Sequence, residues 1–283
     1  AQAPLGAAPC RPPRAASRRR SSPTETPRGP PRRKGAAMAQ QSCCYFRRRA
    51  GGFLCVTQAN LEDFVGDAIA TSTNRRLEGA HRRNWWGFAG RRSADAALHA
   101  RAGAELLRLC HERASELRFG EVLATPAGPR LDAQHVLHTA VPSHPAGRDP
   151  RPLPASQAAD FVEAPEAAEL LRRSYAELLR TAAELGVQSL ACPAIGCGCR
   201  GYPVREAAEV ALRAVGEDAA VPYVELRFWD TATFWAWRDR CPEVGLDPCG
   251  WDDVAGALWR GQALADWQAE RLRARDAPGC RLS

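Results

Sequence analysis

A glycine-rich stretch at residues 192–203 holds the residue types best suited to chemistry in this chain. Glycines stand at positions 196, 198 and 201, after an apolar run at 187–192 and before Pro203 and a helical pattern. Glycine lets backbone N–H groups turn toward a ligand, and a helix N-terminus adds unpaired donors and a positive dipole end. This order predicts an anion site suited to phosphate. A tight strand-to-helix turn that holds no ligand is the alternative interpretation.

The elements that would position this loop alternate between strands and helices. Apolar runs predict strands at 53–57, 66–71, 120–125, 134–140, 187–192 and 223–229. Amphipathic patterns predict helices at 93–113, at 165–185, after 203 and at 231–240. This alternation predicts an α/β fold whose sheet is covered on both faces. In such sheets ligands bind at the carboxyl ends of strands, so residues 72–74, the glycine loop and the end of the 223–229 strand are expected around one cleft.

Three segments outside this pattern are each open to two interpretations. Residues 75–92 contain Trp85, Trp86 and Phe88, which either pin a loop to the core or form a flap over a ligand. The proline-rich loop at 141–164 is either functional or an insertion. Residues 241–283 are expected to form a helical extension that packs on the domain, with a partner-binding helix as the alternative. Its apolar residues at near-helical spacing are Trp251, Val254, Leu258, Trp259, Leu264, Trp267 and Leu272.

The basic charge of the chain belongs to its first fifty residues. The 283 residues carry a net charge of +7, but residues 1–50 alone carry twelve Arg and Lys and one acid, Glu25, so the remainder sums to −4. A mildly acidic body argues against nucleic acid as a partner of the folded part. Residues 1–50 are expected to be a disordered Arg- and Pro-rich tail, residues 51–240 a single domain. The tail is open to three interpretations: a transit peptide, a segment that touches nucleic acid, or sequence upstream of a start at Met38.

The cysteine content and the length of the apolar runs limit the cellular compartments in which this protein is expected. The chain has eleven cysteines, an odd number, and their spacing is not that of a disulfide framework. This pattern favours reduced thiols in an intracellular protein. The expected compartment is the cytoplasm or nucleus, or an organelle if residues 1–37 are a transit peptide. The pairs at 43–44 and 197–199 lack the spacing of a zinc site, so neither a metal nor a cofactor is expected. No apolar run reaches about 18 residues, so no membrane span is expected.

Four motifs, in order, resemble those of the macrodomains, a family that binds ADP-ribose. Thr-Ser-Thr-Asn at 71–74 resembles the family's Asn-Ala-Ala-Asn, and Ala-Asp-Ala-Ala-Leu-His at 94–99 resembles its Val-Asp-Gly-Ala-Ile-His. Val-Leu-His-Thr-Ala-Val-Pro at 136–142 and the whole of 193–203 match two further motifs. The resemblance covers about residues 52–240 and implies a three-layer α/β/α sandwich with a mixed sheet. Compared with the family pattern, eleven extra residues separate Asn74 from Asp95, so the first phosphate-facing loop is rebuilt.

The resemblance implies a role for each residue of the cleft. Asn74 would hold the distal ribose, and Asp95 would orient or deprotonate a water molecule. An acid that favours the helix dipole is the alternative interpretation of Asp95. The expected ligand-binding residues are Asn60, Ile69, Gly196, Cys197, Gly198, Cys199, Arg200, Gly201 and Trp229.

Several of these residues depart from the family pattern or have a second interpretation. Asn60 stands where the family has an Asp that holds the adenine amino group, and it can still accept a hydrogen bond. Ile69 would form an apolar floor, and Trp229 would either stack on adenine or pack in the core. Arg200 replaces a Phe and could pair with a phosphate. His99 is expected to pack rather than to act in catalysis.

The function expected from these residues is binding of ADP-ribose or of ADP-ribosylated protein by a monomer, with hydrolysis of mono-ADP-ribosyl esters or of O-acetyl-ADP-ribose. A reader module that binds without turnover is the second hypothesis, because the loop before Asp95 is rebuilt. A nucleic-acid-associated protein that acts through its basic tail is the third.

Overall fold

The computed structural model describes three parts of the chain, residues 43–78, 93–147 and 160–258. Its centre is an eight-stranded sheet in the order β4-β5-β3-β6-β7-β2-β1-β8. The strands are β1 (Cys43–Arg47), β2 (Phe53–Gln58), β3 (Ala68–Thr73), β4 (Val122–Pro126), β5 (His135–Ala140), β6 (Ser189–Cys192), β7 (Tyr223–Phe228) and β8 (Asp247–Cys249). The central strands β2, β3 and β6 consist mainly of buried residues, as expected for strands covered on both faces.

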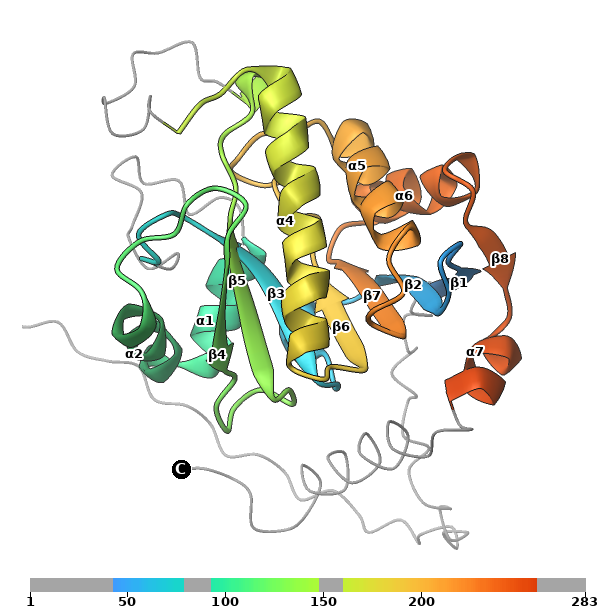
Figure 1. The fold of residues 1–283 in the computed structure, drawn as a ribbon, viewed down its shortest axis with the longest axis horizontal. Coiled ribbons are helices and arrows are strands. Elements are labelled where there is room, and N and C mark those ends of the chain that lie inside the picture. The colour runs from blue at the N-terminus through green and yellow to red at the C-terminus, as the bar shows by residue number, and fades with distance from the viewer. Residues whose placement is uncertain (1–42, 79–92, 148–159, 259–283) are drawn as a thin grey trace, which may run out of the picture. The chain divides into compact units, whose positions relative to one another are not determined.

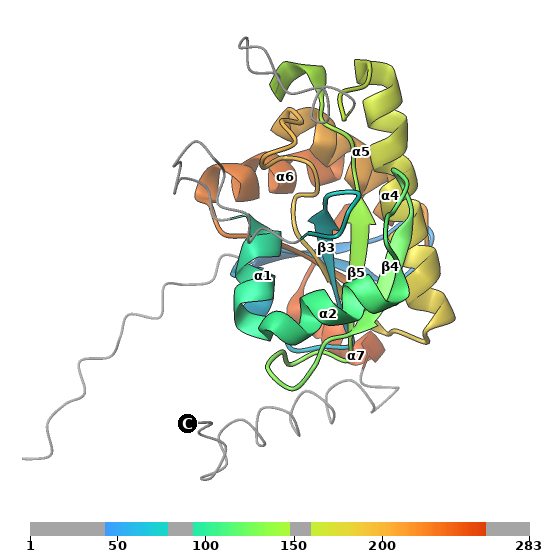
Figure 2. The same cartoon turned by 90° about the vertical axis from the view of Figure 1, so that its left-hand side faces the viewer.

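Helices cover the two faces of the sheet in separate groups (Figures 1 and 2). One group is α4 (Ala164–Glu184), α5 (Val204–Gly216) and α6 (Thr231–Glu243), whose apolar residues join one face of the sheet in the largest core cluster. The other group is α1 (Ala94–Ala102) and α2 (Ala104–Arg113), together with the short 3-10 helix η1 (Leu61–Asp63). The 3-10 turn η3 (Pro145–Gly147) follows β5. The expected three-layer α/β/α sandwich with a mixed sheet is confirmed.

The margin of the sheet and one helix differ from the sequence-based expectation. β1 lies in the segment expected to be disordered, where it pairs with both β2 and β8 in antiparallel fashion. The sheet therefore extends past the boundaries expected at residues 51 and 240. The helix expected at 93–113 is two helices, because Gly103 adopts φ 84° and ends α1.

The expected C-terminal helix is present as α7 (Trp251–Leu258). Val254 is buried and packs against Phe53, Cys55 and Tyr223 on the sheet. Trp259, Leu264, Trp267 and Leu272 lie outside the described residues, as do Trp85, Trp86 and Phe88 and residues 148–159 of the loop expected at 141–164. Within the described residues, no helix has both the length and the apolar character that a membrane span requires.

Candidate functional site

Five neighbouring strands run in the same direction, so their carboxyl ends meet at one edge of the sheet. β2 pairs in parallel with β7, β7 with β6, β6 with β3, and β3 with β5. The segments that leave this edge are Asn60 after β2, Asn74 after β3, residues 141–147 after β5, residues 193–203 after β6 and Trp229 after β7. The sheet topology thus brings together the segments that were expected around one cleft.

The glycine loop, residues 193–203, presents unused backbone donors at this edge. Gly201 N–H donates to Gly198 O at 3.2 Å, and Tyr202 N–H donates to Gly196 O at 3.1 Å, which closes the loop on itself. The loop N–H groups that make no backbone hydrogen bond within the described chain are those of Ala194, Gly196, Gly198, Cys199 and Arg200. Unpaired N–H groups that converge in a loop form an anion-binding concavity.

Two of the loop glycines are required by the backbone. Gly196 has φ 84°, and a Cβ there would lie 2.6 Å from Cδ2 of Tyr202. Gly201 has φ 72°, and a Cβ there would collide with Gly147. Gly198 is exposed, and a Cβ there would meet nothing within 4 Å. A side chain at Gly198 would therefore extend from the loop into open space and leave the fold intact.

Helix α5 begins directly after the loop and adds further donors. Its N-cap residue, Pro203, supplies no side-chain hydrogen bond to the first turn. The first N–H groups of an α-helix have no partner within the helix, and they carry the positive end of its dipole. The loop and the start of α5 together favour a negatively charged ligand.

Arg200, which was expected to meet a phosphate, is engaged by other residues of the chain. Its Nη1 donates to Asp160 Oδ2 at 2.9 Å and to Ser143 Oγ at 3.2 Å. The Arg200 side chain is 13% exposed. The positive charge that Arg200 brings to the glycine loop is therefore already paired.

Asp95 lies in the first turn of α1, beside β3. Ser93 caps the helix, since its Oγ accepts the Ala96 N–H at 3.0 Å. The Thr71 hydroxyl donates to Asp95 Oδ1 at 3.2 Å. Burial raises the pKa of Asp95 to about 7, against the opposing effect of the Thr71 hydrogen bond. A carboxyl group that titrates near neutrality is suited to take up and release a proton at physiological pH.

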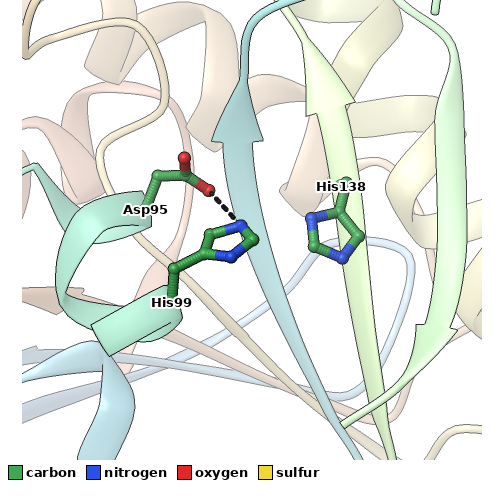
Figure 3. Close-up of side chains that lie close together, drawn as sticks. All are labelled: Asp95, His99 and His138. Atoms are coloured by element: carbon green, nitrogen blue, oxygen red, sulfur yellow. Dashed lines mark ion pairs between the residues drawn. The ribbon is translucent and has the colours of Figure 1, made fainter. Parts of the chain in front are cut away.

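His99 lies one helical turn after Asp95 and contacts it. Its Nε2 is 3.6 Å from Asp95 Oδ1, and the other carboxylate oxygen points away from the imidazole (Figure 3). The His99 side chain is 1% exposed. Sequence reasoning assigned His99 to packing alone; the spacing of four residues on one helix face is the signal for its contact with Asp95.

His138 completes this buried cluster from β5 (Figure 3). Its Nε2 is 3.0 Å from Thr125 Oγ1 and 3.4 Å from Cys110 Sγ. Burial, reinforced by the neighbouring His99, lowers the pKa of His138 to about 3, so the ring is neutral at physiological pH. His138 lies in the middle of an apolar strand, so the sequence around it does not indicate that it lies near His99 of α1.

Donor atoms of Asp95, His99 and His138 lie within 4.8 Å of one another, so these are the side chains among the described residues that could hold a metal ion. Oδ1 of Asp95 already contacts both Thr71 and His99. The three side chains thus take part in the Thr71–Asp95 hydrogen bond, the Asp95–His99 ion-pair contact and the contacts of His138 with Thr125 and Cys110.

Asn74 follows β3, and both ends of its amide are engaged by Glu78. Its Oδ1 accepts the Glu78 N–H at 3.0 Å, and its Nδ2 donates to Glu78 Oε2 at 3.2 Å. The turn between them ends in Leu77, a buried residue with φ 56°. A ligand that binds the Asn74 amide would replace its contacts with Glu78.

The residues expected at the adenine end differ in exposure. Asn60 is exposed, and its Nδ2 donates to Asp63 Oδ2 at 3.0 Å, which leaves its Oδ1 to accept a hydrogen bond. Trp229 is 62% exposed, whereas the preceding Phe228 is buried against Trp237. Ile69 is fully buried in the core cluster beneath α1.

A separate groove of about 520 Å³ lies between β1, α6 and β8. Its lining is Cys43, Cys44, Tyr45, Phe46, Arg238, Asp239, Pro242, Pro248 and Cys249. None of the residues expected to act in binding or catalysis lines this groove, so it is distinct from the glycine-loop edge.

Comparisons with known proteins agree with this architecture. The family model for the Macro domain matches residues 71–211. A Macro domain-containing protein of Streptomyces griseus is 38% identical over 178 residues, which span 61% of this chain and 84% of that protein. An O-acetyl-ADP-ribose deacetylase of Salmonella typhimurium is 32% identical over 167 residues, which span 58% of this chain and 78% of that protein.

A solved structure supports the same fold. A variant of the Oceanobacillus iheyensis macrodomain with ADPR matches with a TM-score of 0.57 and 21% sequence identity. The match covers 72% of this chain and 98% of that one. The match therefore covers more of the chain than residues 71–211, the part that the family model matches.

Proposed function

Because this chain belongs to the macrodomain family, we propose that it binds ADP-ribose at the carboxyl edge of its parallel strands and hydrolyses ADP-ribosyl esters there. The observation that carries the proposal is the glycine loop, where the N–H groups of Gly196, Gly198, Cys199 and Arg200 have no backbone partner among the described residues and lie beside the N-terminus of α5. A diphosphate needs several backbone donors and space that no bulky side chain fills, and the glycines of this loop meet both needs. The name of the Salmonella relative, an O-acetyl-ADP-ribose deacetylase, supports an ester as the substrate.

The adenine and ribose ends of the ligand are assigned to the residues on either side of the loop. Trp229 is free to stack on adenine, and Asn60 Oδ1 is free to accept from the adenine amino group. Asn74 lies at the end of the neighbouring strand, β3, where its amide would bind the distal ribose. Ile69 supports the site from the core, because its side chain is fully buried.

Asp95 is the general base in this proposal. The ionised carboxylate takes a proton from water, the water oxygen adds to the ester carbonyl, and the bond to the ribose oxygen breaks as that oxygen takes up the proton. Positioned bases of this kind contribute about 10²–10⁴-fold in rate. A pKa near 7 suits both halves of the proton transfer.

The experiment that tests this function measures product release from O-acetyl-ADP-ribose and from a mono-ADP-ribosylated protein, with wild type and Asp95→Asn. We expect turnover by the wild type, and a loss of about 10²-fold or more in the variant. Turnover that is undiminished in Asp95→Asn would exclude Asp95 as the base.

A reader module without turnover is the second candidate, and one observation favours it. Both ends of the Asn74 amide are held by Glu78, so the residue assigned to the distal ribose is not free in this conformation. Saturable binding of ADP-ribose with no turnover of either ester would support the reader module.

A further inference from the structure

The side chain of Arg200, a residue of the glycine loop, forms an ion pair with Asp160. Arg200 Nη1 lies 2.9 Å from Asp160 Oδ2, and the two side chains are 13% and 23% exposed. Ser143 Oγ accepts a second hydrogen bond from the same nitrogen at 3.2 Å. A partly buried charge pair of this kind holds its partners more firmly than a surface pair, because solvent screens it less.

The backbone around the pair joins three segments that are distant in sequence. The His144 N–H donates to Arg200 O at 2.8 Å, and the Ser143 N–H donates to Asp160 O at 2.7 Å. Ser143 also forms a parallel bridge with Phe161. The glycine loop is therefore attached to the segment after β5 and, through it, to the segment before α4.

The contact between Gly147 and Gly201 shows how close these segments are. A Cβ on either glycine would collide with the backbone of the other. His144 supports this approach from the side, since its Nδ1 accepts the Ala146 N–H at 3.1 Å and its ring lies 5.1 Å from that of Tyr202. The end of the loop has little room to move while these contacts hold.

We propose that Asp160 and Arg200 are positioning residues, whose ion pair fixes the glycine loop in the conformation that binds the diphosphate. This inference rests on the proposed function. Arg200 acts through the loop backbone, and its guanidinium does not contact the ligand. The opposite arrangement, in which Arg200 leaves Asp160 to pair with a phosphate, makes Asp160 a competitor of the ligand.

The two arrangements predict effects of opposite sign when Asp160 is removed. If the pair positions the loop, Asp160→Ala weakens the binding of ADP-ribose. If Asp160 competes for Arg200, the same change strengthens binding, because the guanidinium becomes free. The affinity for ADP-ribose, measured by calorimetry on the full chain, therefore decides between them.

We expect Asp160→Ala and Arg200→Met each to weaken ADP-ribose binding by about tenfold, since breaking a partly buried pair also leaves the remaining charge without its partner. The double variant, Asp160→Ala with Arg200→Met, removes both charges and should bind no more weakly than either single variant, because the two residues act as one unit. The exchanged pair, Asp160→Arg with Arg200→Asp, should recover a large part of the affinity.

The control is Glu169→Ala, which breaks the exposed pair between Glu169 and Arg172 on α4 and should leave binding unchanged. Thermal unfolding of each variant tests whether it is folded. If a single variant does not fold, the affinity of the exchanged pair still tests the inference. Tighter binding by Asp160→Ala, or no binding by a folded exchanged pair, would overturn the inference. A wild-type chain that does not bind ADP-ribose would contradict the proposed function itself, whereas wild-type binding that is unchanged in Asp160→Ala contradicts this inference alone.

Discussion

The Thr71 hydroxyl on β3 donates a hydrogen bond to Oδ1 of Asp95 on α1, at 3.2 Å. Asp95 is 7% exposed, so this bond acts on a carboxyl group that has little contact with water. It opposes the rise in the pKa of Asp95 that burial causes. The strand thereby lowers the proton affinity of a carboxyl group that α1 supplies.

The pH dependence of ester hydrolysis follows from this relationship. Only the ionised form of Asp95 accepts a proton, so kcat/KM should rise as the pH increases through about 7. Thr71→Val removes a bond that favours the ionised form, and the rise should then move to higher pH by up to about one unit. Thr139→Val is the matched control, because its hydroxyl donates to Glu121 O instead. A rise that stays in place in Thr71→Val would contradict the assignment.

Asp95 should make the folded state less stable at pH values above about 7 than at acidic pH. Its pKa is about 7 in the folded chain, against an ordinary value of 3.8, so the unfolded chain loses this proton first. Stability is therefore lost as the pH rises from about 4 to about 7, by a few kcal/mol. Asp95→Asn should raise the unfolding temperature more at pH 8 than at pH 4. Equal effects at both pH values would show that Asp95 does not resist ionisation.

Trp229 should contribute to binding without contributing to stability. It is 62% exposed, and stacking of a base on an aromatic side chain contributes about 1–3 kcal/mol. Trp229→Ala should weaken the binding of ADP-ribose by about tenfold or more and leave the unfolding temperature unchanged. Trp251→Ala, at an exposed tryptophan on α7, is the comparison, and it should leave binding unchanged.

Arg48 should anchor the first strand to the rest of the domain. It is 4% exposed, and its guanidinium donates to Asp218 O at 2.9 Å, to Val215 O at 3.3 Å and to Val221 O. Burial lowers the pKa of Arg48 to about 10. Arg48→Met should lower the free energy of unfolding by about 2–4 kcal/mol, because it leaves buried carbonyl groups without a donor. Arg118→Met, at an exposed arginine, should change it little. A similar effect of the two substitutions on denaturant unfolding would contradict this role.

The sequence predicts the centre of the fold better than its margin. The central strands and α4 carry long, regular apolar patterns, and the parallel order places Asn74 and the glycine loop at one edge. β8 has three residues, of which one is Pro248, so its place in the sheet depends on β1 rather than on any local preference. Residues 43–47 follow a tail rich in Arg and Pro, which concealed β1.

The site contains one contact that the sequence could have predicted and one that it could not. His99 lies within one helical turn of Asp95, and helix spacing alone could have identified that pair. Arg200 and Asp160 are 40 residues apart and meet only because two loops pack together. A charged residue in a glycine loop resembles a phosphate ligand until its partner is known.

Titration of the full chain with ADP-ribose, in parallel with Gly198→Glu, tests the central claim most directly. Gly198 is exposed and has open space around it, so the glutamate adds bulk and negative charge to the loop without disturbing the fold. We predict saturable heat of binding for the wild type and none for the variant, with equal unfolding temperatures. No binding by the wild type, or equal binding by both proteins, would contradict a diphosphate site on this loop.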